Sequence, residues 1–124
     1  MSTRSLIAKQ NKNGSITSIY CHNDGYPSGV GKILKEHYAN NRKVVSLIAL
    51  GWISSLEKTI NGTVAYYRDR SQDKRIDKFK SIEEFDKTDL CHDYVYLWDG
   101  KRWKIKDNYS KYANLTKKII KDDE

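Results

Sequence analysis

Alternating apolar and polar positions near the start of the chain predict two β-strands joined by a tight turn. The segments 5–10 and 15–22 flank Asn11–Gly14, and an asparagine followed by glycine at this place is typical of a hairpin. Successive side chains of a strand point to opposite faces, which suits one buried and one exposed side in each segment. We therefore expect an antiparallel β-hairpin over residues 5–22.

After residue 30 the pattern changes to that of an α-helix. Large or apolar side chains recur at intervals of three and four residues, at Val30, Ile33, Leu34, His37 and Tyr38. Ser28 is a suitable N-cap for this helix. A second helix is expected over residues 42–50, ended by Gly51.

Further strands are expected in the second half of the chain. A β-branched and aromatic run predicts a strand over residues 63–68. Asp99–Gly100 lies between the alternating runs 93–98 and 101–106, which predicts a second hairpin. Residues 52–62 are expected to be irregular.

Two helices complete the predicted elements. Ser81, followed three residues later by Glu84, is a capping box that opens a short helix, and helical spacing predicts a closing helix over residues 109–120. The order of elements predicts an α+β fold. We expect an antiparallel sheet of about five strands (two hairpins plus a central strand) with the helices packed on one face, in a single domain over residues 1–124.

The composition suits one globular domain. The 124 residues are 38% hydrophobic and 31% charged, which excludes collagen-like and low-complexity classes. The longest apolar run, residues 44–53, is too short to cross a membrane, and the first residues lack the apolar segment of a secretory signal. Two cysteines make no disulfide framework. We therefore expect a cytoplasmic protein.

The chain is basic, with a formal net charge of +7, and a positive field attracts phosphate-bearing partners. In residues 68–80, three aspartates separate six basic residues. Such a run suits a solvated surface. Alternatively, Arg68 and Arg70 bind a phosphate, because each guanidinium can pair with it through two hydrogen bonds.

The segment Gly29–Lys32 is similar to part of a phosphate-binding loop. A complete loop needs a glycine where Tyr26 stands and a serine or threonine where Ile33 stands, so nucleoside-triphosphatase activity is not predicted. A glycine-rich turn that opens a helix can still present N–H groups to an anion. Gly31 and Lys32 are therefore candidate ligand contacts, with a plain start of a helix as the alternative.

His22 and Asp24 lie in a turn-rich loop, and an aspartate can orient a histidine as a general base. Together with an arginine that holds a phosphate, they would make a metal-free phosphodiesterase. The alternative is structural, with Asp24 capping the turn and His22 bonding at the end of the strand. The pairs Cys21–His22 and Cys91–His92 lack the spacing of a zinc site, so no metal is predicted.

The aromatic residues are mostly of the kind with a polar tip. Nine tyrosines and three tryptophans stand against two phenylalanines, which suits half-exposed surfaces that stack nucleobases. Tyr66 precedes the arginines of residues 68–70, and Tyr20 and Tyr26 flank the loop of His22. This combination favours a ligand with a base and a phosphate.

Several segments carry a resemblance to a known family. They are Ser2–Ser5, Ile19–Pro27, Gly31–Tyr38, Leu47–Gly51 with Ser54–Leu56, and Tyr67–Arg70. Through them the chain resembles a family of small proteins encoded by phages and prophages, over residues 1–70 and more loosely over 94–103. Asn23 stands where family members often have tryptophan, and Ser71 where they have glycine. Phage proteins of this size commonly counter host defence, some of them by sequestering nucleotide signals of Thoeris and CBASS systems.

The residues and the resemblance together predict a phage anti-defence protein in an infected bacterial host. It would bind and sequester a nucleotide immune signal, of the cyclic ADP-ribose or cyclic oligonucleotide type, without catalysis or cofactor. Two alternatives stay open: a phosphodiesterase that cleaves such a signal, and an anti-CRISPR-like inhibitor that binds a host nuclease or nucleic acid. A homodimer is expected, because tyrosine and tryptophan favour interfaces. The predicted ligand-binding residues are Arg4, Tyr20, His22, Asp24, Tyr26, Gly31, Lys32, Tyr66, Arg68 and Arg70.

Overall fold

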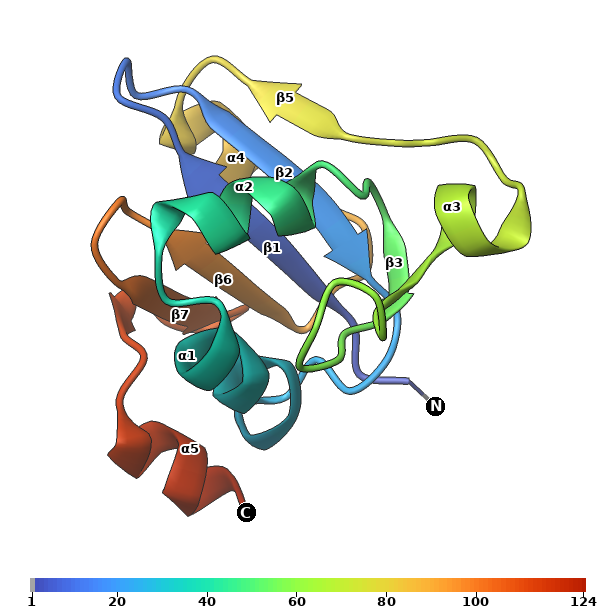
Figure 1. Ribbon diagram of the computed structural model, residues 1–124. Helices are drawn as coiled ribbons and strands as arrows, with labels where there is room; N and C mark the ends of the chain where they lie inside the picture. Colours follow the sequence, from blue (N-terminus) through green and yellow to red (C-terminus); the bar gives the residue numbers. More distant parts are fainter. Residues whose placement is uncertain (1) are drawn as a thin grey trace.

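Eight short strands form one mixed β-sheet, with helices packed against both of its faces (Figure 1). The arrangement is that of a computed structural model, which describes residues 2–124. The strands are β1 (Ser5–Gln10), β2 (Ile16–Cys21), β3 (Ile53–Ser55), β4 (Val64–Ala65), β5 (Asp77–Phe79), β6 (Tyr94–Trp98), β7 (Trp103–Asp107) and β8 (Ala113–Asn114). The helices are the π-helical turn η1 (Pro27–Gly31), α1 (Lys32–His37), α2 (Asn41–Ile48), α3 (Tyr66–Arg70), α4 (Ile82–Asp86) and α5 (Lys117–Asp123).

Along the sheet the strand order is β4–β3–β2–β1–β6–β7–β8, and β5 pairs with the first residues of β2. The pairs β1–β6 and β2–β3 are parallel, whereas the other pairs are antiparallel. The predicted α+β class and both predicted hairpins are confirmed. The prediction of an antiparallel sheet of about five strands is wrong, because parallel pairs join segments that no turn signal connects.

β1 lies in the middle of the sheet because it is apolar on both sides. Its residues 5–8 are all buried, and it pairs with β2 on one edge and β6 on the other. A strand buried on both faces reads as a continuous apolar run rather than an alternating one. Leu6, Ile7 and Ala8 form such a run.

The two faces of the sheet are covered unequally. α1, α2 and α5 pack on one face, where Leu34, Leu47 and Ile120 belong to the larger apolar cluster (Figure 1). α4 packs Phe85 on the opposite face, in a smaller cluster with Leu6. The prediction that all helices share one face is therefore wrong. No helix within residues 2–124 is long and apolar enough to cross a membrane.

The strand predicted over residues 63–68 is wrong beyond its first half. Val64–Ala65 form β4, and the chain then turns into α3. The Asp69 carboxylate accepts a hydrogen bond from the backbone N–H of Ala65, 2.8 Å away, which satisfies a free donor at the start of the helix. Local capping therefore outweighs the β-propensity of this aromatic segment.

Two predicted helix limits also differ from the structure. Ser28 lies inside η1, which begins after Tyr26 with Pro27 in its first turn, so Ser28 is not an N-cap. The predicted closing helix is shorter: α5 begins after Thr116, whose hydroxyl accepts from the N–H of Ile119. The capping box at the start of α4 is confirmed.

Candidate functional site

An aromatic groove lies at the edge of the sheet face that carries α4. Its walls are the rings of Tyr20 from β2, Trp52 before β3 and Tyr66 at the start of α3, together with residues 71–73 and Arg75. The groove measures about 710 Å³. The Tyr20 and Trp52 ring centroids are 4.8 Å apart. The loop between α3 and β5 therefore closes one side of a concave aromatic surface.

Arg75 is held on the indole of Trp52 by a shared carboxylate. Its guanidinium carbon lies 4.1 Å from the centroid of the Trp52 ring. Asp77 accepts one bond from the Trp52 Nε1–H, at 2.9 Å, and one from the Arg75 Nε–H, at 3.1 Å. The terminal Nη groups of Arg75 make no hydrogen bond within residues 2–124, so this fixed guanidinium keeps its forked donors available.

Arg70 and Tyr66 form a second arginine–ring pair at the groove. The guanidinium carbon of Arg70 is 5.5 Å from the centroid of the Tyr66 ring. In the part of the chain that the structure describes, Arg70 makes no ion pair. A guanidinium over an aromatic face can bind an anion and still contact the ring.

Tyr20 lines the groove from β2, and its neighbours His22 and Arg4 lie just outside the strands, after β2 and before β1. The Tyr20 hydroxyl and the His22 Nδ1 are 2.8 Å apart. Burial raises the pKa of the Tyr20 phenol, and the positive charge of Arg4 opposes that rise. The charge of Arg4 therefore reaches the Tyr20 phenol. Of the residues predicted from the sequence, Tyr20 and Tyr66 line the groove, and His22 and Arg70 each contact one of these two side chains.

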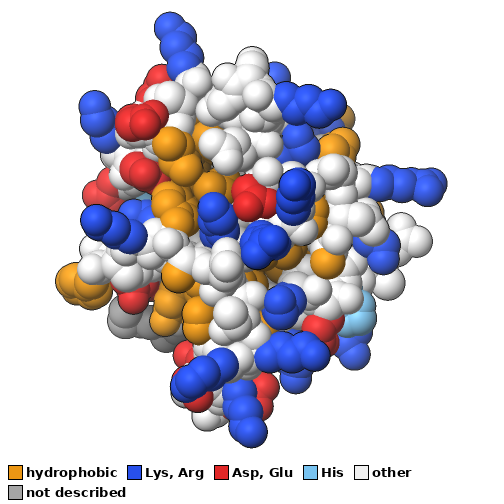
Figure 2. All heavy atoms as spheres, turned by 90° about the vertical axis from the view of Figure 1, so that its left-hand side faces the viewer, with side chains coloured by type: hydrophobic (Ala, Val, Ile, Leu, Met, Phe, Trp, Pro, Cys, Tyr) orange, Lys and Arg blue, Asp and Glu red, His pale blue; other side chains and the backbone are white. Residues whose placement is uncertain are grey.

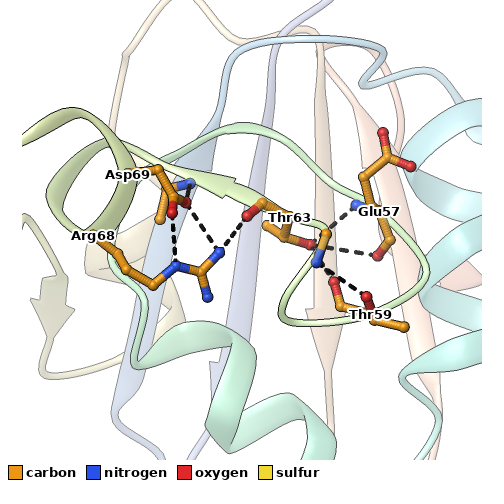
Figure 3. Close-up of polar contacts among 7 residues, drawn as sticks. Glu57, Thr59, Thr63, Arg68 and Asp69 are labelled. Atoms are coloured by element: carbon orange, nitrogen blue, oxygen red, sulfur yellow. Dashed lines mark hydrogen bonds and ion pairs between the residues drawn. The ribbon is translucent and has the colours of Figure 1, made fainter.

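Arg68 bonds to its own segment of the chain, to Asp69 and Thr63 (Figure 3). Its Nε and Nη2 atoms donate to the two carboxylate oxygens of Asp69, each at 3.0 Å, and Nη2 also donates to the Thr63 carbonyl. The hydrogen bond from Arg68 lowers the pKa of the Asp69 carboxyl. Thr63 in turn bonds to the backbone of Glu57 and Thr59. Arg68 therefore joins α3 to the preceding loop. It does not join Arg70 in a common phosphate-binding site.

The remaining predicted residues lie beside α5. The Tyr26 hydroxyl donates to the Asp24 carboxylate at 3.3 Å, and the charge of Asp24 raises the pKa of Tyr26. Gly31 is buried against Tyr96, where an added Cβ would lie 3.1 Å from the ring. The Lys32 ammonium faces Glu124, 3.7 Å away. No side-chain hydrogen bond, ion pair or ring contact within residues 2–124 links these residues to the groove.

The turn at the start of α1 binds an anionic group, which is a carboxylate of the same chain. The Asp123 carboxylate accepts from the Ser28 N–H at 2.9 Å and from its hydroxyl at 2.7 Å. These hydrogen bonds therefore fasten η1 to α5, and the turn is not free to bind another anion through Ser28. His22 and Asp24 likewise bond to different tyrosines and make no histidine–aspartate pair.

Sequence reasoning missed Trp52, Arg75 and Asp77. Trp52 lies in a segment expected to be irregular, and Arg75 lies in the charged run interpreted as solvated. The spacing of Arg75 and Asp77 is compatible with one strand face, but nothing in the sequence brings Trp52 to them. That contact requires the pairing of β5 and β3 with the same strand, β2.

No protein-family model, curated protein or solved structure matches this chain. The groove is suited to ligands that are planar and anionic, because it combines aromatic rings with guanidinium groups. Figure 2 shows lysines and arginines spread over the face drawn there, with acidic side chains between them.

Proposed function

We propose that the protein binds a phosphate-bearing nucleotide in the groove between Tyr20, Trp52 and Tyr66. The observation that carries this proposal is the guanidinium of Arg75, stacked on Trp52 and fixed through its Nε by Asp77. An arginine held in this way loses little freedom when its remaining donors bind a phosphate.

The groove offers a distinct partner to each part of a nucleotide. Arg75 and Arg70 would pair with phosphate oxygens, and the ring of Tyr66 would stack with the base. Asp73, which also lines the groove, would accept a bond from an exocyclic amine. The two roles, neutralising charge and covering a planar group, are those that the sequence suggests for these residue types.

The arrangement favours sequestration over hydrolysis. The His22 Nδ1 is engaged by the Tyr20 hydroxyl, and Asp24 bonds to Tyr26, so the predicted general base lacks its orienting carboxylate. The resemblance to small phage-encoded proteins, of a size that commonly counters host defence, suggests a biological setting for such binding, in which the ligand is a nucleotide signal of host immunity.

The test is retention and release of an intact ligand. The protein is incubated with cyclic dinucleotides and cyclic ADP-ribose isomers, freed of unbound compound and heat-denatured, and the supernatant is chromatographed. We expect one class of compound to be returned unchanged. Cleaved products would instead identify a phosphodiesterase, and failure to retain any compound would contradict the proposal.

Two tyrosines provide matched variants for this test. Tyr66→Ala removes a ring from the groove, whereas Tyr109→Ala removes a ring that is 98% exposed and lies outside it. Retention should fall in the first variant and persist in the second. A retained partner whose affinity falls steeply with salt would instead point to nucleic acid.

We also propose that the protein forms a homodimer. Tyr67 and Tyr109 are 54% and 98% exposed, and tyrosine is enriched at protein interfaces. Light scattering at tens of micromolar protein should give twice the monomer mass. A monomer mass would contradict this proposal and leave the binding proposal intact.

A further inference from the structure

A second hollow adjoins the aromatic groove on the same face of the sheet. It measures about 470 Å³ and lies between α4, the loop of residues 87–93 and the strands β1 and β6. Leu6, Phe85 and Val95 form its apolar floor. None of the residues predicted from the sequence as ligand contacts lines this hollow.

One pair of strand partners links the floors of the two hollows. Leu6 lines the second hollow and Tyr20 lines the groove, and these residues are direct partners in the β1–β2 ladder. Partners on one face of an antiparallel pair have Cβ atoms about 5 Å apart. Arg4 stands at the junction, since its backbone N–H donates at 3.0 Å to Asp93, which lines the second hollow.

The polar groups of the second hollow are mainly acceptors. The carboxylates of Asp86, Asp89 and Asp93 each accept one bond, from the Tyr112 hydroxyl, the Cys91 N–H and the Arg4 N–H. In each case a single carboxylate oxygen is used within residues 2–124. Lys106 is the one basic residue of the lining, and its ammonium lies 5.5 Å from the centroid of the Tyr112 ring.

His92 adds an unsatisfied group to this lining. Its Nδ1 is fully buried and has no hydrogen-bond partner among the described residues. Desolvation lowers the pKa of His92, so the ring is neutral at pH 7. A buried polar atom without a partner costs free energy unless a ligand or water meets it.

We propose that this second hollow holds a sugar joined to the phosphate of the nucleotide bound in the groove. The inference rests on the proposed function and specifies its ligand as a nucleoside diphosphate, or a cyclic or linear phosphodiester, that carries a second sugar. The base and phosphates lie at Tyr66, Arg70 and Arg75, the bridging phosphate lies at Arg4, and the second sugar lies over Leu6.

The charge of the two hollows dictates this orientation. Three carboxylates repel a phosphate, whereas sugar hydroxyls donate to carboxylate oxygens in charge-assisted hydrogen bonds. The Thr88 hydroxyl can complete a bond to a further hydroxyl. The apolar floor suits the C–H face of a sugar ring.

The test compares nucleotides with and without a second sugar on the full-length protein. Isothermal titration calorimetry is done with ADP against ADP-ribose and with GDP against GDP-mannose. For at least one base, the compound with the sugar should bind about tenfold more tightly, which corresponds to one or two additional charge-assisted hydrogen bonds. The His92 ring signals in NMR spectra should shift with that compound and stay unchanged with the plain nucleotide.

A matched pair of variants locates the effect. Asp89→Asn keeps an acceptor for the Cys91 N–H and removes the charge, so it should abolish most of the tenfold advantage and leave ADP and GDP binding unchanged. Asp122→Asn, on α5, should change neither. Equal affinity of the two compounds, or an advantage that survives Asp89→Asn, overturns this inference while the groove remains a nucleotide site. Failure of all four compounds to bind also overturns this inference, and the retention test with cyclic nucleotides then decides the proposed function by itself.

Discussion

The start of α1 and the groove around Trp52 both expose positive charge beside a turn, yet they differ in what neutralises it. At the start of α1, Asp123 and Glu124 reach back to Ser28 and Lys32 from the other end of the chain. In the groove, Asp77 binds Arg75 through Nε alone and leaves its forked end free. A basic segment is therefore a candidate binding site only where the fold brings no carboxylate to satisfy all of its donors.

The largest expected effect follows from removing the free guanidinium. Arg75→Ala should weaken binding of the retained nucleotide by about 1.5–3 kcal/mol, because a hydrogen bond to a charged group is lost. The melting temperature should stay nearly unchanged, since the Arg75 side chain is 55% exposed. Calorimetric titration measures the first quantity and circular dichroism the second.

Arg42→Ala is the charge-matched control for that variant. Arg42 is exposed on α2, on the opposite side of the sheet from the groove. Its replacement should leave nucleotide affinity unchanged. An equal loss in both variants would mean that overall charge, rather than the stacked arginine, attracts the ligand.

A smaller effect, on stability alone, is expected at the start of α1. Asp123→Ala removes the acceptor of two hydrogen bonds from Ser28 and should lower the free energy of unfolding by about 1 kcal/mol. Nucleotide affinity should not change. Urea denaturation is the measurement, with Asp122→Ala as control, because Asp122 makes an exposed pair with Lys118 that is worth less than about 0.5 kcal/mol. Reduced ligand binding in Asp123→Ala would contradict the conclusion that the start of α1 serves stability and the groove serves binding.

The smallest expected effect concerns the ionisation of two tyrosines, one in each region. The charge of Asp24 raises the pKa of Tyr26, whereas burial raises that of Tyr20. Asp24→Asn should therefore bring the pKa of Tyr26 back towards its ordinary value of 10.0 and leave Tyr20 unchanged. NMR titration of labelled tyrosine rings separates the two, and a shift of both together would contradict the assigned causes.

The sign of the linked stability follows from the same shifts. Both phenols keep their protons in the folded state at a pH where the unfolded chain has lost them. Their contribution to stability is therefore present below pH 10 and is lost as the pH rises above that value. Bound nucleotide should alter the titration of Tyr20 and leave that of Tyr26 unchanged.

Local signals predict the α+β class and the individual hairpins of this fold, but not the order and direction of its strands. The turns Asn11–Gly14 and Asp99–Gly100 identify both hairpins, and Ser81 identifies the start of α4. These signals act within a few residues. The parallel pairs β1–β6 and β2–β3 depend on contacts between distant segments, and no local residue specifies them.

The same division holds for the site. Tyr66 and Arg70 are recognisable from the sequence because they are close neighbours in it and stay together on α3. Arg68 is equally suggestive, yet the adjacent Asp69 and the Thr63 carbonyl occupy its Nε and Nη2 donors. The stacking of Arg75 on Trp52 depends on strand pairing and so has no sequence signal of its own.

The parallel pairing of β1 with β6 also bears on how the protein is synthesised. β2 can pair with β1 soon after the two leave the ribosome, whereas β6 begins only at Tyr94. Until then the other edge of β1, from Ser5 to Lys9, has no partner strand. An apolar edge left open during translation can pair with a neighbouring nascent chain. Rapid overproduction is therefore expected to favour aggregation of incomplete chains, and slower translation or a chaperone that covers this edge should raise the yield of folded protein.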